Sequence, residues 1–346
     1  MSKAVRVAVG ILCSDDRQIL LASRPADKPW PYWWELPGGK IEPSETPLEA
    51  VARELHEELG VHIQTQSATH WHTLTHHYPR GTVILELFII RRWSGTPQPL
   101  EGQTLAWALP DQLGNIGPIL PATLPILRWL QLPQHYLISS AQADPKQWLL
   151  RLEQTLQTKP HLVQFREPEW QIRANQDNLA AKDLQSCFEK TMAICARYQT
   201  PCLVNSIHPK SWWLTAQGVH LRSSDAQQLS TLPDRFHTVQ AHFELPANHL
   251  IGVSAHCLTE LQLAARLHAD FAVLGHVLET PSHPTETPLG WDSFAQLADA
   301  VALPVYALGG QNSTTLSTAL NHGAQGIAGI RQLLSAPSNT QKHTPL

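Results

Sequence analysis

The sequence lacks a cysteine framework and an excess of charge of either sign. Its five cysteines form no CxxC pair and show no regular spacing. That usage indicates reduced, mostly buried thiols in a cytosolic protein, not a set of disulfides. The formal net charge is −4 over 346 residues, so no basic field draws the chain to nucleic acid. If nucleotides are substrates, we expect them to be bound one at a time, in a pocket.

The sequence also lacks an apolar run of transmembrane length. The apolar stretch after residue 4 alternates like a strand and has no signal-peptide cleavage pattern. We therefore expect a cytoplasmic protein that binds neither membranes nor nucleic acid directly; its oligomeric state is left open. The length is too great for one ordinary domain and suits two.

Histidine and tryptophan are abundant, with nineteen and twelve residues. Four of the histidines, His70, His72, His76 and His77, cluster in THWHTLTHHYP. This cluster can be interpreted as a metal site, but no cysteine or carboxylate in the stretch completes a ligand set. We therefore favour a strand edge with exposed histidines.

The most informative stretch is GGKIEPSETPLEAVARELHEELGV, residues 38–61. Thr46 followed by Pro47 predicts the start of a helix, and Gly60 predicts its end. The apolar face of this helix comprises Leu48, Val51, Leu55 and Leu59. Its glutamates lie on a different face.

Glu54, Glu57 and Glu58 lie at positions i, i+3 and i+4 of this helix. Carboxylates one turn apart can share hard divalent cations, which neutralise phosphate oxygens and lower the pKa of a bound water. That chemistry suits the hydrolysis of a phosphoanhydride. The alternative is a solvated acidic face that pairs with Arg53. The two glycines and Glu45 upstream favour the catalytic interpretation.

The stretch resembles the Nudix box, GX5EX7REUXEEXGU, at every defined position. These positions hold Gly39, Glu45, Arg53, Glu54, Leu55, Glu57, Glu58, Gly60 and Val61. The resemblance implies a mixed α/β/α sandwich that cleaves a nucleoside diphosphate linked to a further group, with Mg²⁺, or alternatively Mn²⁺, as cofactor. It further implies that Arg53 orients a glutamate and that Glu45 supports the loop–helix geometry.

The flanking sequence is similar to MutT-type 8-oxo-dGTP diphosphatases, including Arg24 after the second predicted strand. Glu101, in Glu101–Gly102–Gln103, lies where such enzymes carry an additional metal-binding or catalytic glutamate. Glu101 can also be interpreted as an exposed loop residue, but its context favours function. The implied metal ligands are Glu54, Glu57, Glu58 and Glu101, and the implied catalytic residues are Arg53, Glu54, Glu57 and Glu101. We expect substrate contacts from Arg24, Gly38, Gly39, Lys40 and Thr123.

One departure concerns the base. The MutT group reads the oxidised purine with an asparagine in a PAN motif, where this chain has Pro121–Ala122–Thr123. A threonine offers one hydroxyl, whereas an amide offers a donor and an acceptor. Losing that contact costs on the order of 1–3 kcal/mol of selectivity. We predict an 8-oxo-dGTP diphosphatase that sanitises the nucleotide pool, with another nucleotide or a thiamine-pathway pyrophosphate as the alternative substrate.

The chain is predicted to be α/β throughout, and its pattern changes near residue 136. In the first part we expect a strand pair at 5–13 and 18–23, a turn at 37–39, further strands at 69–74, 82–91 and 104–108, and a helix at 123–130. Beyond it, short apolar strands alternate with helices, which predicts a (β/α)8 barrel of TIM type. The barrel strands are expected at 136–139, 161–165, 202–205, 218–221, 250–254, 271–275, 305–308 and 326–330. We predict domains at 1–132 and 136–335 and a disordered tail at 336–346.

The second half resembles thiamine phosphate synthase and its TenI relatives. Seven short motifs occur in the family's order, beginning with Gln164–Phe165–Arg166 and Asn205 and ending with Gly323–Ala324–Gln325–Gly326. The resemblance implies a ligand site at Gln164, Arg166, Asn205, Asp225, Ser254, Thr280, Ser282, Gly309 and Gly310, in which Asp225 stands at one of the family's two metal-ligand positions.

Three departures concern the activity of this barrel. Glu167 stands where a lysine helps to hold pyrophosphate, Ser206 stands where an aspartate binds magnesium, and the phosphate loop at 280–283 has lost its lysine. We therefore expect a degenerate or ligand-binding barrel that takes a thiamine-related phosphate. The alternative is a bifunctional protein with an active synthase.

Overall fold

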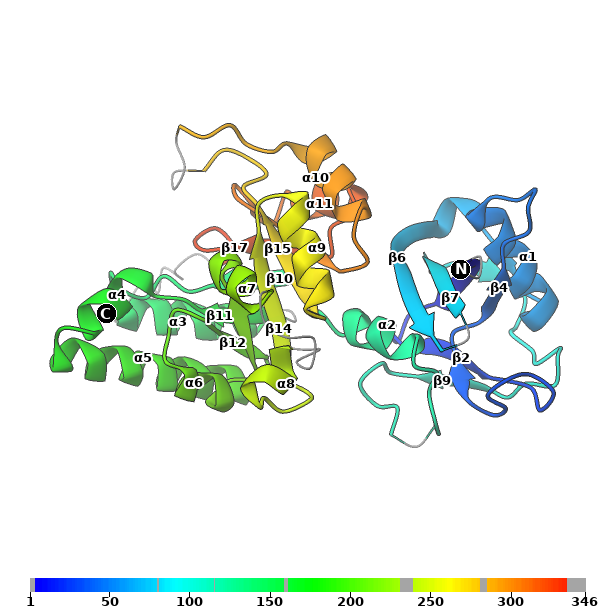
Figure 1. Ribbon diagram of the computed structural model, residues 1–346, viewed down its shortest axis with the longest axis horizontal. Coiled ribbons are helices and arrows are strands. Elements are labelled where there is room, and N and C mark those ends of the chain that lie inside the picture. Colours follow the sequence, from blue (N-terminus) through cyan, green and yellow to red (C-terminus); the bar gives the residue numbers. More distant parts are fainter. Residues whose placement is uncertain are drawn as a thin grey trace, which may run out of the picture. The chain divides into compact units, whose positions relative to one another are not determined.

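The computed structural model describes residues 4–79, 81–114, 116–158, 161–230, 239–280 and 285–334, and the chain divides into two compact units between Leu132 and Pro133 (Figure 1). The predicted tail and Ser282 lie outside the described residues. No helix in the described ranges is both long enough and apolar enough to cross a membrane.

The first unit contains a four-stranded sheet in the order β4-β1-β7-β6 and a three-stranded sheet in the order β3-β2-β9; β5 pairs with β8. Its strands are β1 (Val5–Leu12), β2 (Ile19–Ser23), β3 (Trp34–Glu35), β4 (Gly38–Lys40), β5 (His62–Ile63), β6 (Ala68–Tyr78), β7 (Gly81–Ile90), β8 (Trp93–Ser94) and β9 (Leu105–Ala108). Its helices are α1 (Pro47–Leu59), the 3-10 turn η1 (Thr65–Ser67) and α2 (Thr123–Leu130).

One helix covers each face of the larger sheet, which confirms the α/β/α sandwich. Alternate residues of β7 point to opposite faces, and Phe88 packs with the buried side of α1. On the opposite face His72 pairs in register with Leu87. The ring of Trp129 in α2 lies 5.7 Å from that of His72.

Helix α1 forms as its sequence predicts. The Thr46 side chain accepts a hydrogen bond from the backbone N–H of Glu49, and the Glu49 carboxylate in turn accepts one from the backbone N–H of Thr46. Gly60 ends the helix in the left-handed conformation at φ 68°. Val51, Leu55 and Leu59 are fully buried, whereas Leu48 is partly buried.

Two predictions for this unit are wrong. The strands at 5–13 and 18–23 exist, but β1 pairs with β4 and β7, whereas β2 pairs with β3 and β9. Only an isolated bridge between Cys13 and Ile19 joins them, because other strands occupy both edges of each. The expected turn at 37–39 contains most of β4, which pairs with β1. Gly38 permits this close pairing: at φ 142°, a Cβ there would lie 2.2 Å from the carbonyl oxygen of Ala8.

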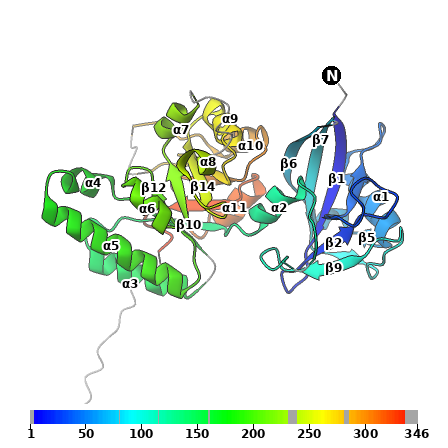
Figure 2. The ribbon, with the colours of Figure 1, turned by 60° about the horizontal axis from the view of Figure 1, so that its bottom comes forward.

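The second unit is a closed barrel of eight parallel strands, β10 to β17 in sequence order, as predicted. Figure 2 shows three of these strands, β10, β12 and β14, among the helices of the unit. The strands are β10 (His135–Ile138), β11 (Leu162–Phe165), β12 (Cys202–Asn205), β13 (Gly218–Leu221), β14 (Leu250–Ala255), β15 (Phe271–Gly275), β16 (Val305–Leu308) and β17 (Gly326–Gly329). The helices are α3 (Pro145–Leu156), α4 (Pro168–Ala174), α5 (Asn178–Arg197), α6 (Lys210–Thr215), α7 (Ser223–Leu229), α8 (Val239–Phe243), α9 (Leu258–Arg266), α10 (Trp291–Asp299) and α11 (Leu316–Asn321).

Aromatic rings fill the interior of the barrel. Tyr136, Phe271 and Tyr306 are fully buried and pack edge-on or tilted against one another at centroid distances of 5.3–5.7 Å. The barrel is therefore a packed core, and any ligand site must lie where its strands end.

Candidate functional site

Arg53 is the centre of the carboxylate cluster on α1. Its guanidinium donates to both oxygens of Glu45, at 3.1 and 2.6 Å, and to the backbone oxygen of Lys40 at 3.1 Å. Nη1 also donates to Glu54 at 2.9 Å and to Glu57 at 3.0 Å. The predicted role of orienting a glutamate therefore extends to three glutamates.

The two glycines of β4 receive two carboxylates of α1. A Cβ on Gly39 would lie 2.1–2.2 Å from the carboxylate atoms of Glu54, so only glycine leaves room for that side chain. The backbone N–H of Gly38 donates to Glu58 at 3.1 Å. Strand β4 thus fixes the cluster through its backbone. The side chain of Lys40 is exposed.

Repulsion between carboxylates marks this cluster as a place for a cation. Burial raises the pKa of Glu58 to about 8 although Gly38 donates to it, and the charges of Glu101, Glu54 and Glu35 add to the rise. Burial also raises the pKa of Glu54, against the opposing effect of Arg53. A divalent cation bound among these groups would relieve the repulsion.

Glu101 is held beside the end of α1 by Gln103. The side-chain oxygen of Gln103 accepts from the backbone N–H of Glu101 at 2.7 Å, and its amide nitrogen donates to the backbone oxygen of Glu58 at 2.8 Å. Lys28 pairs with the Glu101 carboxylate at 3.3 Å. Sequence reasoning treated Gln103 only as context, although the Glu-Gly-Gln stretch contained the signal for this bridge.

The implied ligands fit magnesium by their chemistry. Glu54, Glu57, Glu58 and Glu101 offer only carboxylate oxygens, which hard divalent cations prefer. Glu54 and Glu57 each bond Arg53 through one oxygen, so Arg53 leaves the other oxygen of each unbonded. Within the described ranges, however, no three histidine, cysteine or acidic side chains already converge as a metal site.

The guanidinium of Arg24 is hydrogen-bonded to other groups of the first unit. Its Nη1 donates to both oxygens of Glu35 at 2.9 Å, and its Nε donates to the backbone oxygen of Pro29 at 2.7 Å. Burial raises the pKa of Glu35 despite this pairing. Glu35 was not identified from the sequence as the partner of Arg24. Its position shortly before the glycine pair Gly38–Gly39 was the available signal.

Thr123 begins α2 and is 5% exposed. The segment before it is held against β3, because the N–H of Trp34 donates to Pro118 at 2.8 Å and the N–H of Leu120 donates to Trp34 at 2.9 Å. Strand β3 also carries Glu35. The segment before the predicted base-reading position is therefore hydrogen-bonded to the strand that carries Glu35.

The histidine cluster lies on β6 at the edge of its sheet, as predicted. The expected exposure holds for His70 and His77 but is wrong for His72, which is 6% exposed because it faces the side of the sheet that α2 covers. A carboxylate from outside the stretch does approach it, because β7 brings Glu86 within 3.2 Å of His70, but no three potential metal ligands converge there among the described residues. Glu86 is 8% exposed and also accepts from Arg6 at 2.6 Å and from Thr73 at 2.8 Å. These bonds commit Glu86 to the sheet.

Three of the predicted barrel residues are joined inside the barrel. Gln164, Asn205 and Ser254 belong to one hydrogen-bonded chain that also contains Tyr136 and His220. Sequence reasoning did not single out Tyr136 or His220 as site residues, since each is typical of a strand core.

Asp225 is paired internally. Arg222 donates to its two oxygens at 2.8 and 2.9 Å, and the hydroxyl of Ser206 donates to it as well. Burial alone would raise the pKa of Asp225, but these bonds hold it below its usual value. The position expected to bind a metal is therefore occupied by an arginine.

Glu167, which stands in place of the family's lysine, is hydrogen-bonded within its own unit. Its buried carboxylate accepts from the hydroxyl of Ser139 at 2.5 Å and from the N–H groups of Ala141 at 2.7 Å and Gln142 at 3.0 Å. These three donors compensate its charge and tie together the loops that follow β10 and β11.

Arg166 is half-buried and its guanidinium has no hydrogen-bonding partner among the described residues. Burial lowers its pKa against the opposing charge of Glu167, and the nearby charge of Arg222 lowers it further. The Arg166 guanidinium thus lies near the Arg222 guanidinium and has no hydrogen-bonded carboxylate among the described residues. This arrangement favours the binding of an anion.

The remaining predicted barrel residues are placed by packing. At φ 95° and 67°, Gly309 and Gly310 lie so close to the next loop that a Cβ would meet His276 at 2.4 Å and Leu278 at 2.7 Å. Thr280 is half-buried. The structure thus explains the glycine pair by close packing.

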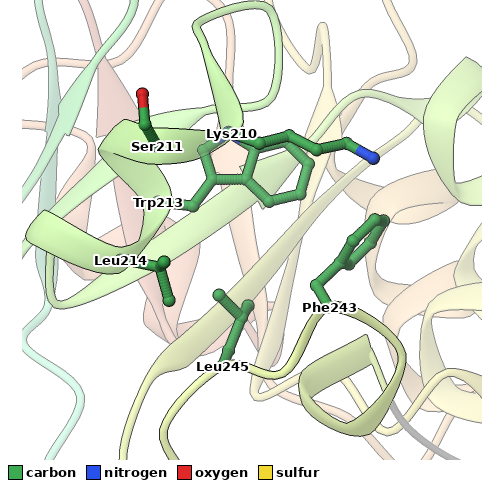
Figure 3. Close-up of a pocket in the computed structure, with 6 residues that line it drawn as sticks. All are labelled: Lys210, Ser211, Trp213, Leu214, Phe243 and Leu245. Carbon is green, nitrogen blue, oxygen red and sulfur yellow. The ribbon is translucent and has the colours of Figure 1, made fainter.

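A separate pocket of about 180 Å³ lies between α6 and the segment around α8 (Figure 3). It is lined by Lys210, Ser211, Trp213, Leu214, Phe243 and Leu245. The ammonium group of Lys210 lies 4.7 Å from the centre of the Phe243 ring. None of these residues is in the predicted ligand set.

Comparisons with known proteins match both units. Residues 4–130 match the NUDIX domain family, and residues 135–333 match the family described as thiamine monophosphate synthase. The 8-oxo-dGTP diphosphatase of Escherichia coli is 36% identical over 129 residues, covering 37% of this chain and 98% of that protein. The CTP pyrophosphohydrolase of the same organism is 35% identical over 128 residues, covering 36% and 90%. The thiamine-phosphate synthase of Lysinibacillus sphaericus is 26% identical over 201 residues, covering 58% and 86%.

The contact between Gly39 and Glu54 gives a test of the site. Replacing Gly39 with alanine should displace the Glu54 carboxylate and weaken Mg²⁺ binding by about tenfold or more. Isothermal titration of the full chain with MgCl₂ measures this, with circular dichroism to check folding. Gly114→Ala is the matched control, because nothing lies within 4 Å of a Cβ there. Unchanged Mg²⁺ affinity in folded Gly39→Ala would contradict the assignment.

Proposed function

This chain belongs to the Nudix family through residues 4–130 and to the thiamine monophosphate synthase family through residues 135–333, and from this premise we propose a specific hydrolase. The first unit is a Mg²⁺-dependent pyrophosphohydrolase that cleaves 8-oxo-dGTP into the nucleoside monophosphate and pyrophosphate. In this way it removes an oxidised precursor from the nucleotide pool.

The observation that carries this proposal is the cluster that Arg53 and β4 hold on α1. Arg53 bonds three glutamates, and Gly39 leaves room for one of them. Glu54, Glu57, Glu58 and Glu101 would hold the metal. When bound, Mg²⁺ neutralises phosphate oxygens and lowers the pKa of a bound water. Arg53 keeps the carboxylates oriented, and the exposed Glu57 carboxylate is accessible to a solvent-borne substrate.

Glutamine substitutions test the roles of the glutamates. Glu54→Gln and Glu57→Gln retain shape but remove a charge, so each should lower kcat for 8-oxo-dGTP by at least about a hundredfold. Glu49→Gln is the control on the same helix, since among the described residues the Glu49 side chain bonds only the N-cap residue Thr46. Pyrophosphate release in the presence of Mg²⁺ is the measurement. Full activity in both cluster variants would refute the proposed metal site.

Thr123 is proposed to contact the base and to limit its selection. An asparagine at this position would add a donor and an acceptor. We expect Thr123→Asn to raise the ratio of kcat/KM for 8-oxo-dGTP over dGTP by about tenfold. Thr123→Val, which removes the hydroxyl but keeps the shape, should not raise it. If Thr123→Asn leaves the ratio unchanged, the base is read elsewhere.

For the barrel, we propose ligand binding without synthase turnover. The supporting observation is the pairing of Asp225 with Arg222 and Ser206, which removes a carboxylate expected to bind magnesium. Arg166 remains available for an anion such as a thiamine-related phosphate. An active synthase, which would make the protein bifunctional, is the alternative.

Thermal melting of the full chain tests the barrel proposal. Thiamine phosphate should raise the melting temperature of wild type, because binding to the native state stabilises it. Arg166→Gln should abolish the shift, whereas the exposed Arg173→Gln should keep it. Incubation with the thiazole phosphate and the pyrimidine pyrophosphate should yield no thiamine phosphate. Measurable coupling of the two would establish the bifunctional alternative.

A further inference from the structure

A chain of hydrogen bonds crosses the interior of the barrel from a backbone amide to a serine. It runs from the N–H of Ile207 through Asn205, Gln164, Tyr136 and His220 to Ser254. All four intermediate side chains are at most 2% exposed. Because water does not reach them, every donor and acceptor along the chain must be matched within it.

The first half of the chain has a fixed direction. The N–H of Ile207 donates to the side-chain oxygen of Asn205 at 3.1 Å, so the nitrogen of that amide faces the other way. This nitrogen donates to the oxygen of Gln164 at 2.8 Å, which in turn directs the nitrogen of Gln164 toward Tyr136. A reversed amide at either position would bring two donors or two acceptors together.

The direction continues through Tyr136. Its hydroxyl oxygen accepts from Gln164 at 2.9 Å and lies 3.1 Å from Nδ1 of His220. A protonated Nδ1 would leave the tyrosine hydrogen without an acceptor in a fully buried position, which is costly. The hydroxyl of Tyr136 therefore donates to Nδ1, and the proton of a neutral His220 is on Nε2.

The last link ends at Ser254. Nε2 of His220 lies 2.9 Å from Oγ of Ser254. Burial, reinforced by the charge of Arg166, lowers the pKa of His220 to about 3, so the ring remains neutral at physiological pH. With its proton on Nε2, His220 donates to Ser254 and has no lone pair there to take up the serine proton.

We infer that Ser254 is a directed hydrogen-bond donor to the ligand of the barrel, and that His220 is a positioning residue and not a general base. The short distance between His220 and Ser254 would suit a nucleophilic dyad. The direction of the hydrogen bonds opposes that interpretation, because it places the His220 proton on Nε2. Ser254 is half-buried, and its hydroxyl hydrogen is used by no bond within the described ranges.

The direction of the hydrogen bonds restricts which ligand atom can bind Ser254. The atom that meets Ser254 is a hydrogen-bond acceptor, such as a phosphate or carbonyl oxygen or an unprotonated ring nitrogen. Arg166, which follows β11 at the same end of the barrel, also only donates. Only the identity of the acceptor depends on the barrel proposal above; the tautomer of His220 does not.

Nuclear magnetic resonance of the full chain labelled with ¹⁵N-histidine tests the inference directly. Two-bond proton–nitrogen correlations distinguish the protonated ring nitrogen from the bare one. We expect His220 to show the Nε2–H tautomer in an excess of roughly tenfold or more over the other. Ser254→Ala identifies its resonance and should keep the tautomer, because Tyr136 sets it. Predominance of the Nδ1–H tautomer in wild type would overturn the inference.

Two tyrosine variants provide a matched comparison. Tyr136→Phe removes the donor to Nδ1, so a second tautomer of His220 should appear. Tyr306→Phe removes a buried hydroxyl that donates to the backbone oxygen of Pro133, outside the chain, and should leave the tautomer unchanged. An unchanged tautomer in folded Tyr136→Phe would contradict the assigned direction.

A chemical probe gives a readout that needs no variant. A fluorophosphonate labels a serine that a neighbouring base has activated. Peptide mass spectrometry of the treated full chain should find Ser254 unmodified. Stoichiometric labelling of Ser254 would show that His220 acts as a base.

Discussion

The first unit depends on one guanidinium that holds like charges together. Without Arg53, Glu45, Glu54 and Glu57 would repel one another on and beside one helix, and a capped helix alone would not fix their direction. The backbone of β4 also positions two carboxylates. Gly39 leaves space for that of Glu54, and the N–H of Gly38 donates to that of Glu58. The result is an oriented set of oxygens in which burial and mutual repulsion still favour a cation.

In the barrel, too, carboxylates are held by hydrogen-bond donors, but there both oxygens of Asp225 and of Glu167 are bonded. Asp225 and Glu167 are each satisfied by donors from their own unit, so neither carboxylate is left for a metal. Two polar groups of the predicted ligand set at this end of the barrel, Arg166 and Ser254, can act as donors. One unit therefore presents acceptors suited to a metal, and the other presents donors suited to an anion.

The sequence indicated most elements but not their partners. Periodicity and capping residues located α1 and the barrel strands, because those signals are local. The separation of β1 from β2 into different sheets depended on which distant strands compete for their edges. Similarly, the sequence did not show that Asp225 pairs with Arg222 or that Arg24 pairs with Glu35. These pairings determine which charged side chains remain available to bind a ligand or a metal. The direction of the chain through His220 required five side chains from different strands, and no spacing in the sequence indicates it.

The most direct test of the central claim is a hydrolysis panel on the full chain with Mg²⁺. The panel contains 8-oxo-dGTP, the four canonical deoxynucleoside triphosphates, CTP, ADP-ribose and hydroxymethylpyrimidine pyrophosphate, with products separated by ion-exchange chromatography. The account predicts the highest kcat/KM for 8-oxo-dGTP, with pyrophosphate and the monophosphate as products and no turnover in EDTA. An intact 8-oxo-dGTP pool after prolonged incubation would contradict it.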